Sequence, residues 1–329
     1  MSEKEKPVPG TGGDIYIPIE KRTGEKSIVY ITRNLSGEGL ESIYDLVKAP
    51  LSGRIGIKLH TGEPDGPNII PHDWVEKLVK ERLPDAKIVE TNVYYESPRQ
   101  TTEGHREVLK TNGWTFCPVD IMDEEGTFLM PVPHGKWFTH MSEGTHVLNY
   151  DSILVLTHFK GHSQGGFGGS NKNVGIGFAD GKEGKKWIHT AEGSSDQWSI
   201  NREEIMERIT ESTEATVTHF KDHITYINVM RNMSVDCDCA GTTAAPVVTP
   251  DVGILGSLDI LALDQACVDI VFAMASPQGD ALRERILSRR GLRQLSYMKE
   301  LGMGNDLYTL IDIETGKETT AKEVAANLK

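Results

Sequence analysis

Residues 54–94 read RIGIKLHTGEPDGPNIIPHDWVEKLVKERLPDAKIVETNVY, and this stretch decides the fold. Residues 54–60 alternate between apolar and polar side chains as a strand does, and residues 87–94 repeat the pattern. Between them, Trp74 and Leu78 recur at helical spacing, and Pro84 closes the helix. The stretch therefore predicts two parallel strands that are joined by a crossover helix.

The same alternation continues on both sides of this unit. Further strands are expected at residues 27–32, 115–129 and 145–157, and further helices at 102–112 and 261–274. We therefore expect an α/β fold with a mixed, largely parallel sheet that carries helices on its faces. Two smaller expectations concern the C-terminal half. Asn201 and Glu204 fit the start of a helix, and residues 307–313 fit an edge strand.

The domain organisation follows from composition along the chain. Residues 1–24 are polar and rich in proline and glycine, so we expect them to form a flexible N-terminal arm. Residues 25–329 then form a single α/β domain, which could divide into lobes at residues 25–156 and 157–329. No stretch between the two lobes is rich enough in linker residues to predict independent domains.

Charge and hydropathy limit the partners of the protein. The 329 residues include 48 acidic and 35 basic side chains, a formal net charge of -13, which argues against a nucleic-acid partner. No stretch approaches the roughly 18 apolar residues of a membrane span. The first residues hold no apolar core of signal-peptide length, so we expect a cytoplasmic protein without a membrane partner. Apolar stripes on the last helices would suit a homodimer and a buried core equally well.

Two cysteines lie one residue apart in VDCDCAG, residues 235–241. In an extended segment Cys237 and Cys239 point to one face, with backbones roughly 6.6 Å apart. Thiolates that bind one tetrahedral ion lie on the order of 3.7 Å apart, so both sulfurs could reach one metal ion or one iron–sulfur cluster. The remaining ligands would come from elsewhere. Two structural cysteines before a glycine turn explain the pattern equally well.

Residues 161–177, GHSQGGFGGSNKNVGIG, contain seven glycines. Backbone N–H groups of such a loop can form an anion-binding concavity. Over residues 157–186 five lysines stand against two acidic residues, so this segment is basic in an acidic chain and suits a small anionic molecule. It matches neither the dinucleotide fingerprint nor the P-loop, and a solvated surface loop explains the same composition. The candidate ligands in this segment are Lys172, Asn173, Gly168 and Gly169.

Polar side chains also gather where predicted strands end. His158 and Lys160 would share one face at the end of a strand, and His162 follows directly. Ligands usually bind at the carboxyl ends of parallel strands, and histidine titrates near neutral pH. These three residues are therefore candidate catalytic groups, although structural histidines are as common. Further candidate ligands of the anion, at the ends of the neighbouring strands, are Lys58, His60 and Arg99.

Two of these motifs together resemble the family known as domain of unknown function 362. One is Lys160-Gly-His162 with the glycines and Lys172-Asn173 after it, and the other is Cys237-Asp-Cys239 followed by PDVGIL, residues 250–255. The resemblance extends from about residue 50 over most of the chain. It implies an iron–sulfur or metal-associated protein. The ferredoxin-type insertion with four closely spaced cysteines, which many members carry, is absent from this sequence.

The leading hypothesis is a cytoplasmic enzyme, with redox chemistry, that depends on a metal ion or an iron–sulfur cluster at Cys237 and Cys239. The basic glycine-rich segment would hold a small anionic substrate beside that centre. One alternative is a metal-independent binding protein for an anionic metabolite. Another is a structural partner whose cysteines are buried thiols. The leading hypothesis requires that the two sulfurs and Lys172 line a common cavity.

Overall fold

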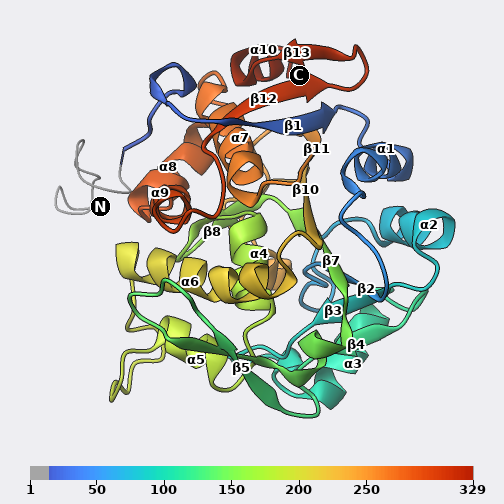
Figure 1. Ribbon diagram of the computed structural model, residues 1–329, viewed down its shortest axis with the longest axis vertical. Helices are drawn as coiled ribbons and strands as arrows, with labels where there is room; N and C mark the ends of the chain where they lie inside the picture. Colours follow the sequence, from blue (N-terminus) through green and yellow to red (C-terminus); the bar gives the residue numbers. More distant parts are fainter. Residues whose placement is uncertain (1–14, 329) are drawn as a thin grey trace.

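The computed structural model describes residues 15–328, and its central feature is a nine-stranded sheet (Figure 1). The strand order is β13-β12-β1-β11-β10-β7-β2-β3-β4. Strands pair in parallel from β10 through β4 and between β1 and β12. Strands β11 and β13 run antiparallel to their neighbours. The predicted α/β fold with a mixed, largely parallel sheet is confirmed.

Strands from both halves of the sequence enter this one sheet. Its members are β1 Lys26–Thr32, β2 Ile55–Lys58, β3 Lys87–Glu90, β4 Val119–Ile121, β7 Ser152–His158, β10 Ile224–Met230, β11 Gly253–Ser257, β12 Leu307–Asp312 and β13 Lys317–Thr319. Two small sheets pair β5 Thr127–Pro131 with β6 His140–Gly144, and β8 Lys160–His162 with β9 Gly166–Gly168. The second of these small sheets carries part of the candidate site.

Helices cover both faces of the large sheet (Figure 1). One layer consists of α1 Gly37–Val47, α2 His72–Arg82 and α3 Thr102–Thr111. The other contains α4 Ser170–Gly177, α5 Gly184–His189, α6 Arg202–Phe220, α7 Ile260–Ala273, α8 Asp280–Ser288 and α9 Arg293–Glu300, and α10 Ala321–Ala326 contacts α7. In β7, Ile153 and Val155 pack with the α4–α7 layer and Leu154 and Leu156 with the α1–α2 layer. A strand buried on both faces explains this continuous apolar run.

The structure departs from several sequence expectations. Thr145–Asn149 forms a 3-10 turn and β7 begins only at Ser152, because Asp151 is held by the backbone and side chain of Arg54. Asn201 precedes α6 without a side-chain cap. Strand β12 is not an edge strand, because β13 pairs with its outer side. Strand β3 ends at Glu90, which frees the following residues to line a cavity.

The predicted arm, residues 1–24, is described only from residue 15 onward. In that part Arg22 donates to both carboxylate oxygens of Asp269 on α7, at 2.7 and 2.6 Å, and Tyr16 stacks on Phe272 with ring centroids 4.3 Å apart. Residues 15–24 are therefore packed against α7, and the rest of the predicted arm lies outside the described residues. Within residues 15–328, no helix combines the length and the apolar character that crossing a membrane requires.

Candidate functional site

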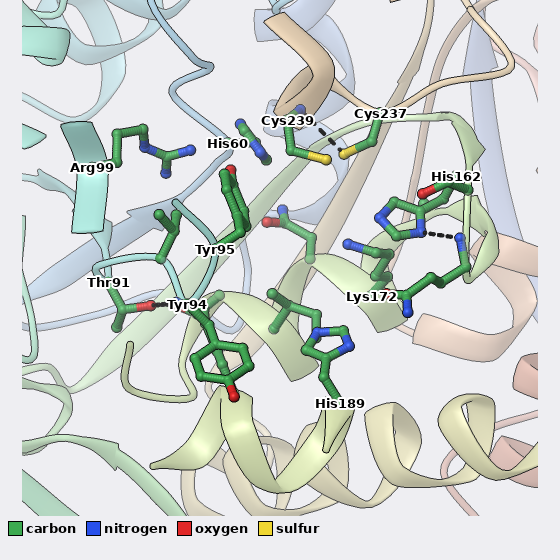
Figure 2. Close-up of a pocket in the computed structure, with 18 of the residues that line it drawn as sticks. His60, Thr91, Tyr94, Tyr95, Arg99, His162, Lys172, His189, Cys237 and Cys239 are labelled. Carbon is green, nitrogen blue, oxygen red and sulfur yellow. Dashed lines mark hydrogen bonds between the residues drawn. The ribbon is translucent and has the colours of Figure 1, made fainter. Parts of the chain in front are cut away.

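A cavity of about 420 Å³ opens where β2, β3 and β7 end (Figure 2). Lys58 ends β2, Glu90 ends β3, and Lys160 follows β7. Further lining residues come from the β8–β9 hairpin, from α4 and α5, and from residues 235–241, which contain Cys237 and Cys239. The carboxyl edge of parallel strands is where open α/β sheets usually place their ligands.

Eleven of the twelve predicted site residues line this cavity. They are Lys58, His60, Arg99, Lys160, His162, Gly168, Gly169, Lys172, Asn173, Cys237 and Cys239. The exception is His158, whose Nδ1 lies 2.9 Å from both carboxylate oxygens of Asp238 and whose Nε2 lies 2.6 Å from the Arg231 carbonyl. Because protein atoms engage both nitrogens and the ring lines no part of the cavity, the structure gives no support to its predicted catalytic role. His158 positions Asp238.

Two thiols and one imidazole meet at one wall of the cavity. The ligand atoms of His162, Cys237 and Cys239 all lie within 4.8 Å of one another (Figure 2). The segment is not extended as expected. Cys237 instead precedes a 3-10 turn, Asp238–Thr243, in which Gly241 has a φ of 54°. This turn, and not the alternation of a strand, brings the two sulfurs together.

A close backbone approach brings His162 to the cysteines. Gly161 in β8 donates its N–H to the Ser234 carbonyl at 2.8 Å, and a Cβ at Gly161 would lie 2.2 Å from the Val235 carbonyl oxygen. Only glycine fits there without a shift of the chain. The next residue in β8 is His162, so this contact sets its distance from Cys237.

The surroundings of this wall shift the pKa values of all three side chains. A hydrogen bond from the Cys239 thiol, together with the charges of Lys160 and Lys172, holds the pKa of Cys237 well below its usual range. The same bond, with burial, raises the pKa of Cys239 well above its usual range. Burial lowers the pKa of His162 to about 4. The lowered pKa of Cys237 favours its thiolate and that of His162 favours a neutral imidazole, and these are the forms that bind metals.

The sequence of residues 55–269 matches the family described as Domain of unknown function (DUF362). The chain belongs to the DUF362 family. The resemblance drawn from the lysine–histidine and cysteine motifs is thereby confirmed, and both motifs now lie on one cavity.

Two solved structures share broad similarity with this DUF362 protein. The lactate racemase apoprotein from Thermoanaerobacterium thermosaccharolyticum has a TM-score of 0.40 at 11% identity, covering 91% of this chain and 85% of that chain. A protein from Thermotoga maritima has a TM-score of 0.40 at 10% identity, covering 87% and 86%. No curated protein matches the sequence. At this level of similarity neither protein lends its activity to the DUF362 chain.

The donor set of the DUF362 site fits a single metal ion. Two sulfurs and one imidazole are ligands that borderline ions such as Zn²⁺ take, and three protein ligands leave a coordination position open. A four-cysteine cluster is not matched by the described residues. Cys267 lies in the core on α7, where its Sγ is 3.5 Å from Asn228 Nδ2, and Cys117 does not line the cavity.

Hydrogen bonds to the His162 ring decide which of its nitrogens carries the proton. Its Nδ1 accepts from the backbone N–H groups of Gln164 at 3.2 Å and Gly165 at 2.8 Å. The neutral ring therefore carries its proton on Nε2, which can donate to Cys237. An ion bound through Nε2 would replace that proton, so metal and proton compete for one position.

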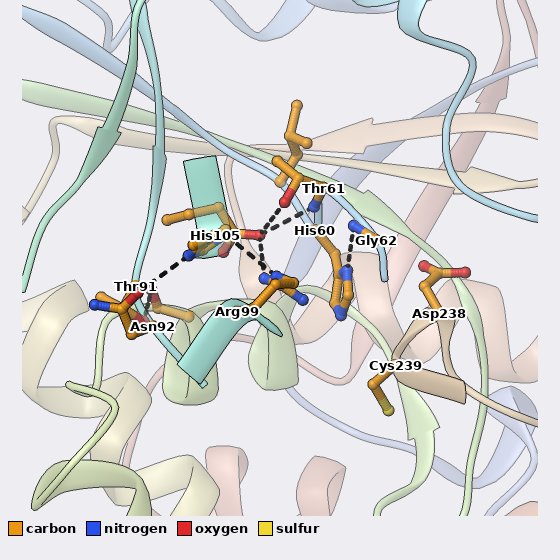
Figure 3. Close-up of polar contacts among 12 residues, drawn as sticks. His60, Thr61, Gly62, Thr91, Asn92, Arg99, His105, Asp238 and Cys239 are labelled. Atoms are coloured by element: carbon orange, nitrogen blue, oxygen red, sulfur yellow. Dashed lines mark hydrogen bonds and ion pairs between the residues drawn. The ribbon is translucent and has the colours of Figure 1, made fainter. Parts of the chain in front are cut away.

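Most cations of the cavity are already paired. Lys58 donates to Glu90 at 2.9 Å, and Lys160 lies 3.1 Å from Asp238. Arg99 donates to Glu63 at 3.1 Å and Glu90 at 3.0 Å. Because the protein's own carboxylates occupy this guanidinium, the structure gives no support to Arg99 as a clamp on a substrate carboxylate (Figure 3).

Lys172 is the exception among these cations. Of the lysines that line the cavity within residues 15–328, Lys172 alone makes neither a hydrogen bond nor an ion pair. The neighbouring Asn173 is different, because Lys58, the Lys58 and Leu156 carbonyls and Thr157 engage its amide. Lys172 is therefore the cation of the DUF362 site that remains for an anionic ligand.

Several lining residues escaped sequence reasoning. Lys185, on α5, donates to Thr91 Oγ1 at 2.6 Å, and burial lowers its pKa to about 8. His189 ends the same helix, and Trp198 lies in the segment that follows it. The basic composition up to Lys186 could have pointed to Lys185. No local pattern distinguishes His189 or Trp198, because the fold alone brings them to the cavity.

Proposed function

We propose that this DUF362 protein is a metal-dependent enzyme that acts on a small anionic molecule. The observation that carries the proposal is a single cavity that contains both a three-ligand group and a cation without a partner. His162, Cys237 and Cys239 form the ligand group, and Lys172 is the cation. The lining residues specify no redox partner, so the proposal covers the metal and the anion alone.

The chain's own residues have distinct roles in this proposal. A bound ion would supply a Lewis acid that polarises an oxygen of the substrate. Lys172 binds the anionic group, and Lys160, held by Asp238 at 3.1 Å, adds positive charge beside Cys237. Lys185 Nζ exchanges a proton with the substrate, because its lowered pKa of about 8 lies close to neutral pH.

Metal analysis of anaerobically purified protein tests the proposal. We expect the wild-type chain to retain about one ion such as Zn²⁺ per chain after dialysis. Cys237→Ser and Cys239→Ser should lose it. Cys117→Ser is the matched control, because this thiol is away from the cavity, and it should retain the ion. Equal metal content in wild-type protein and Cys237→Ser would refute the proposal.

His162→Ala examines the third ligand separately. Replacing a metal ligand should weaken binding more strongly than the 10- to 100-fold typical of residues that only orient a ligand. Binding of Zn²⁺ measured by competition with a chelator gives this ratio. An unchanged affinity would show that the amides of Gln164 and Gly165 keep Nδ1 as an acceptor and that the imidazole does not ligate.

One observation favours a second function, metal-independent binding of an anionic metabolite. The bonds to Nδ1 of His162 place a proton between this ring and Cys237, so the three side chains satisfy one another without an ion. This function predicts that phosphate or a small carboxylate raises the melting temperature equally with and without a chelator. It also predicts that Lys172→Ala abolishes the increase.

A further inference from the structure

We infer that Tyr94, His189 and Trp198 form a ring-binding subsite in the same cavity, and that the substrate is an anion carrying a planar aromatic or heteroaromatic ring. The inference deepens the proposed function, on which it rests only for the anionic group. Three observations carry it: an aromatic wall, a buried imidazole without partners, and the position of Tyr94 and His189 on the side of the cavity away from the sulfur pair.

The wall consists of three rings from separate segments. The Trp198 ring makes edge contacts with Tyr94, at 5.9 Å between centroids, and with His189, at 4.9 Å. All three residues line the cavity, and Trp198 keeps 37% of its surface exposed. Aromatic surface that remains open in a cavity is suited to stacking on a planar ring.

Hydrogen bonds hold this wall in place. Tyr94 Oη lies 3.0 Å from Thr190 Oγ1, and the Tyr94 carbonyl accepts from Gln197 Nε2 at 2.9 Å. Thr190 Oγ1 donates to the Gln197 carbonyl at 2.7 Å. The segment that leads to Trp198 is therefore fixed to Tyr94, in the loop after β3, at both Thr190 and Gln197. A wall that is ordered before binding costs little to organise around a ligand.

His189 supplies the second observation. It is 7% exposed, and neither ring nitrogen makes a hydrogen bond to a described residue. The Nδ1 atom is buried without a partner in a residue that lines the cavity. Buried polar groups without partners are rare in native structures. Burial also lowers the pKa of His189 well below its usual range, so the ring is neutral and can bond a polar substituent.

The positions of these groups define the shape of the ligand. In Figure 2, Tyr94 and His189 lie on the side of the cavity away from Cys237 and Cys239, with Lys172 between the two sides. The charge of Lys172 reaches His189, since it contributes to the lowered pKa of that ring. In the arrangement that we propose, the anionic group binds Lys172, the ring stacks against Trp198 and a ring substituent bonds to His189, all of which line the same cavity.

Binding of matched probes to the full chain tests the inference. The probes are benzoate against acetate, and phenylphosphonate against methylphosphonate, each titrated calorimetrically. We expect the aromatic member of at least one pair to bind roughly tenfold more tightly. The pair that shows the preference identifies the anion as carboxylate or phosphonate-like. Equal affinities within both pairs would overturn the inference.

Variants separate the subsite from the rest of the site. Trp198→Ala should remove the preference for the aromatic probe and leave the affinity for the small anion unchanged, whereas Trp198→Phe should retain most of the preference. A preference that survives Trp198→Ala in a folded protein would contradict the inference. Cys237→Ser distinguishes the two proposals, because the preference should persist in this variant even if no metal binds to the wild-type protein.

Discussion

Asp238 connects two parts of the site at the scale of single residues. Its carboxylate receives the His158 ring and the Lys160 ammonium, and its neighbours in sequence are the two candidate ligands Cys237 and Cys239. Burial acts to raise the pKa of Asp238, but the charges of His158 and Lys160 hold it well below its usual range. A buried ion pair of this kind orders the cysteine turn against β7 and β8.

Replacing this carboxylate should therefore destabilise the protein. Asp238→Asn removes the carboxylate that pairs with the buried Lys160 ammonium, and we expect the free energy of unfolding to fall by about 3–5 kcal/mol. Urea denaturation at pH 7 measures the loss. Asp251→Asn is the matched control, because this exposed carboxylate accepts one backbone N–H at 2.7 Å. Equal losses in the two variants would contradict the assigned role of Asp238.

Glu143 is a second buried carboxyl, with a different pH dependence. Its Oε1 accepts from Thr216 Oγ1 at 2.7 Å, its Oε2 has no partner, and burial raises its pKa to about 8. A carboxyl whose pKa is raised on folding stabilises the protein fully below its unfolded pKa, and this contribution is lost as pH rises through the folded pKa. The folded protein is therefore more stable when the Glu143 carboxyl is neutral than when it is ionised.

We expect the melting temperature of the wild-type protein to fall between about pH 4.5 and pH 8 partly through Glu143, because over this range the folded chain keeps a proton that the unfolded chain has lost. Glu143→Gln, which stays neutral, should lose less over the same interval. Thermal unfolding of both proteins at a series of pH values gives the difference. Parallel melting curves over this range would show that Glu143 is already ionised at neutral pH.

At the scale of elements, the β8–β9 hairpin and α4 show what the sequence could and could not predict. The composition of residues 157–186 correctly indicated a basic segment at a strand end. It did not reveal that several glycines serve close contacts instead of a flexible anion loop. A Cβ at Gly169 would lie 2.5 Å from Asp264, which accepts the Ser170 and Asn171 N–H groups at the start of α4. Such contacts join residues almost a hundred positions apart, so no local pattern shows them.

Substitutions in the β8–β9 hairpin test whether a close glycine contact positions His162. Gly161→Ala should push β8 away from the Val235 carbonyl and lower the affinity for Zn²⁺ by about tenfold, because His162 moves with the strand. Gly168→Ala in the same hairpin is the control. Its nearest atom, Lys160 Cε, would lie at an ordinary 3.5 Å, so metal affinity should hardly change. Metal competition titrations compare the two, and equal affinities would refute the proposed coupling.

At the scale of the whole molecule, strand order explains why the site could largely be located from sequence. The residues at the ends of β2 and β7 were recognisable, because alternating patterns mark where strands end. Parallel pairing then brings those ends to one edge. His189 and Trp198 were not recognisable, because His189 ends a short helix and Trp198 lies in the irregular segment after it. The 3-10 turn Asp238–Thr243 was also missed, since a single turn of this length has no periodic signature in the sequence.

Arg22, which precedes the first strand of the sheet, stabilises the fold through a contact with helix α7. Arg22 makes a bidentate ion pair with Asp269, and Asp269 also accepts from Tyr308 on β12 at 2.8 Å. Arg22→Ala should lower the free energy of unfolding by about 3–5 kcal/mol, because it leaves a buried carboxylate unpaired. Arg54→Ala removes an exposed pair with Asp151, which solvent screens, and should cost far less. Denaturant unfolding curves that coincide for the two variants would contradict this account.

The central claim is that two thiols and one imidazole of this chain hold a single ion beside Lys172. X-ray absorption of the Zn²⁺-loaded protein tests it most directly. We predict two sulfur neighbours at about 2.3 Å, one imidazole nitrogen at about 2.0–2.1 Å and a light-atom neighbour in the open position. A coordination shell made only of oxygen and nitrogen atoms would contradict the claim.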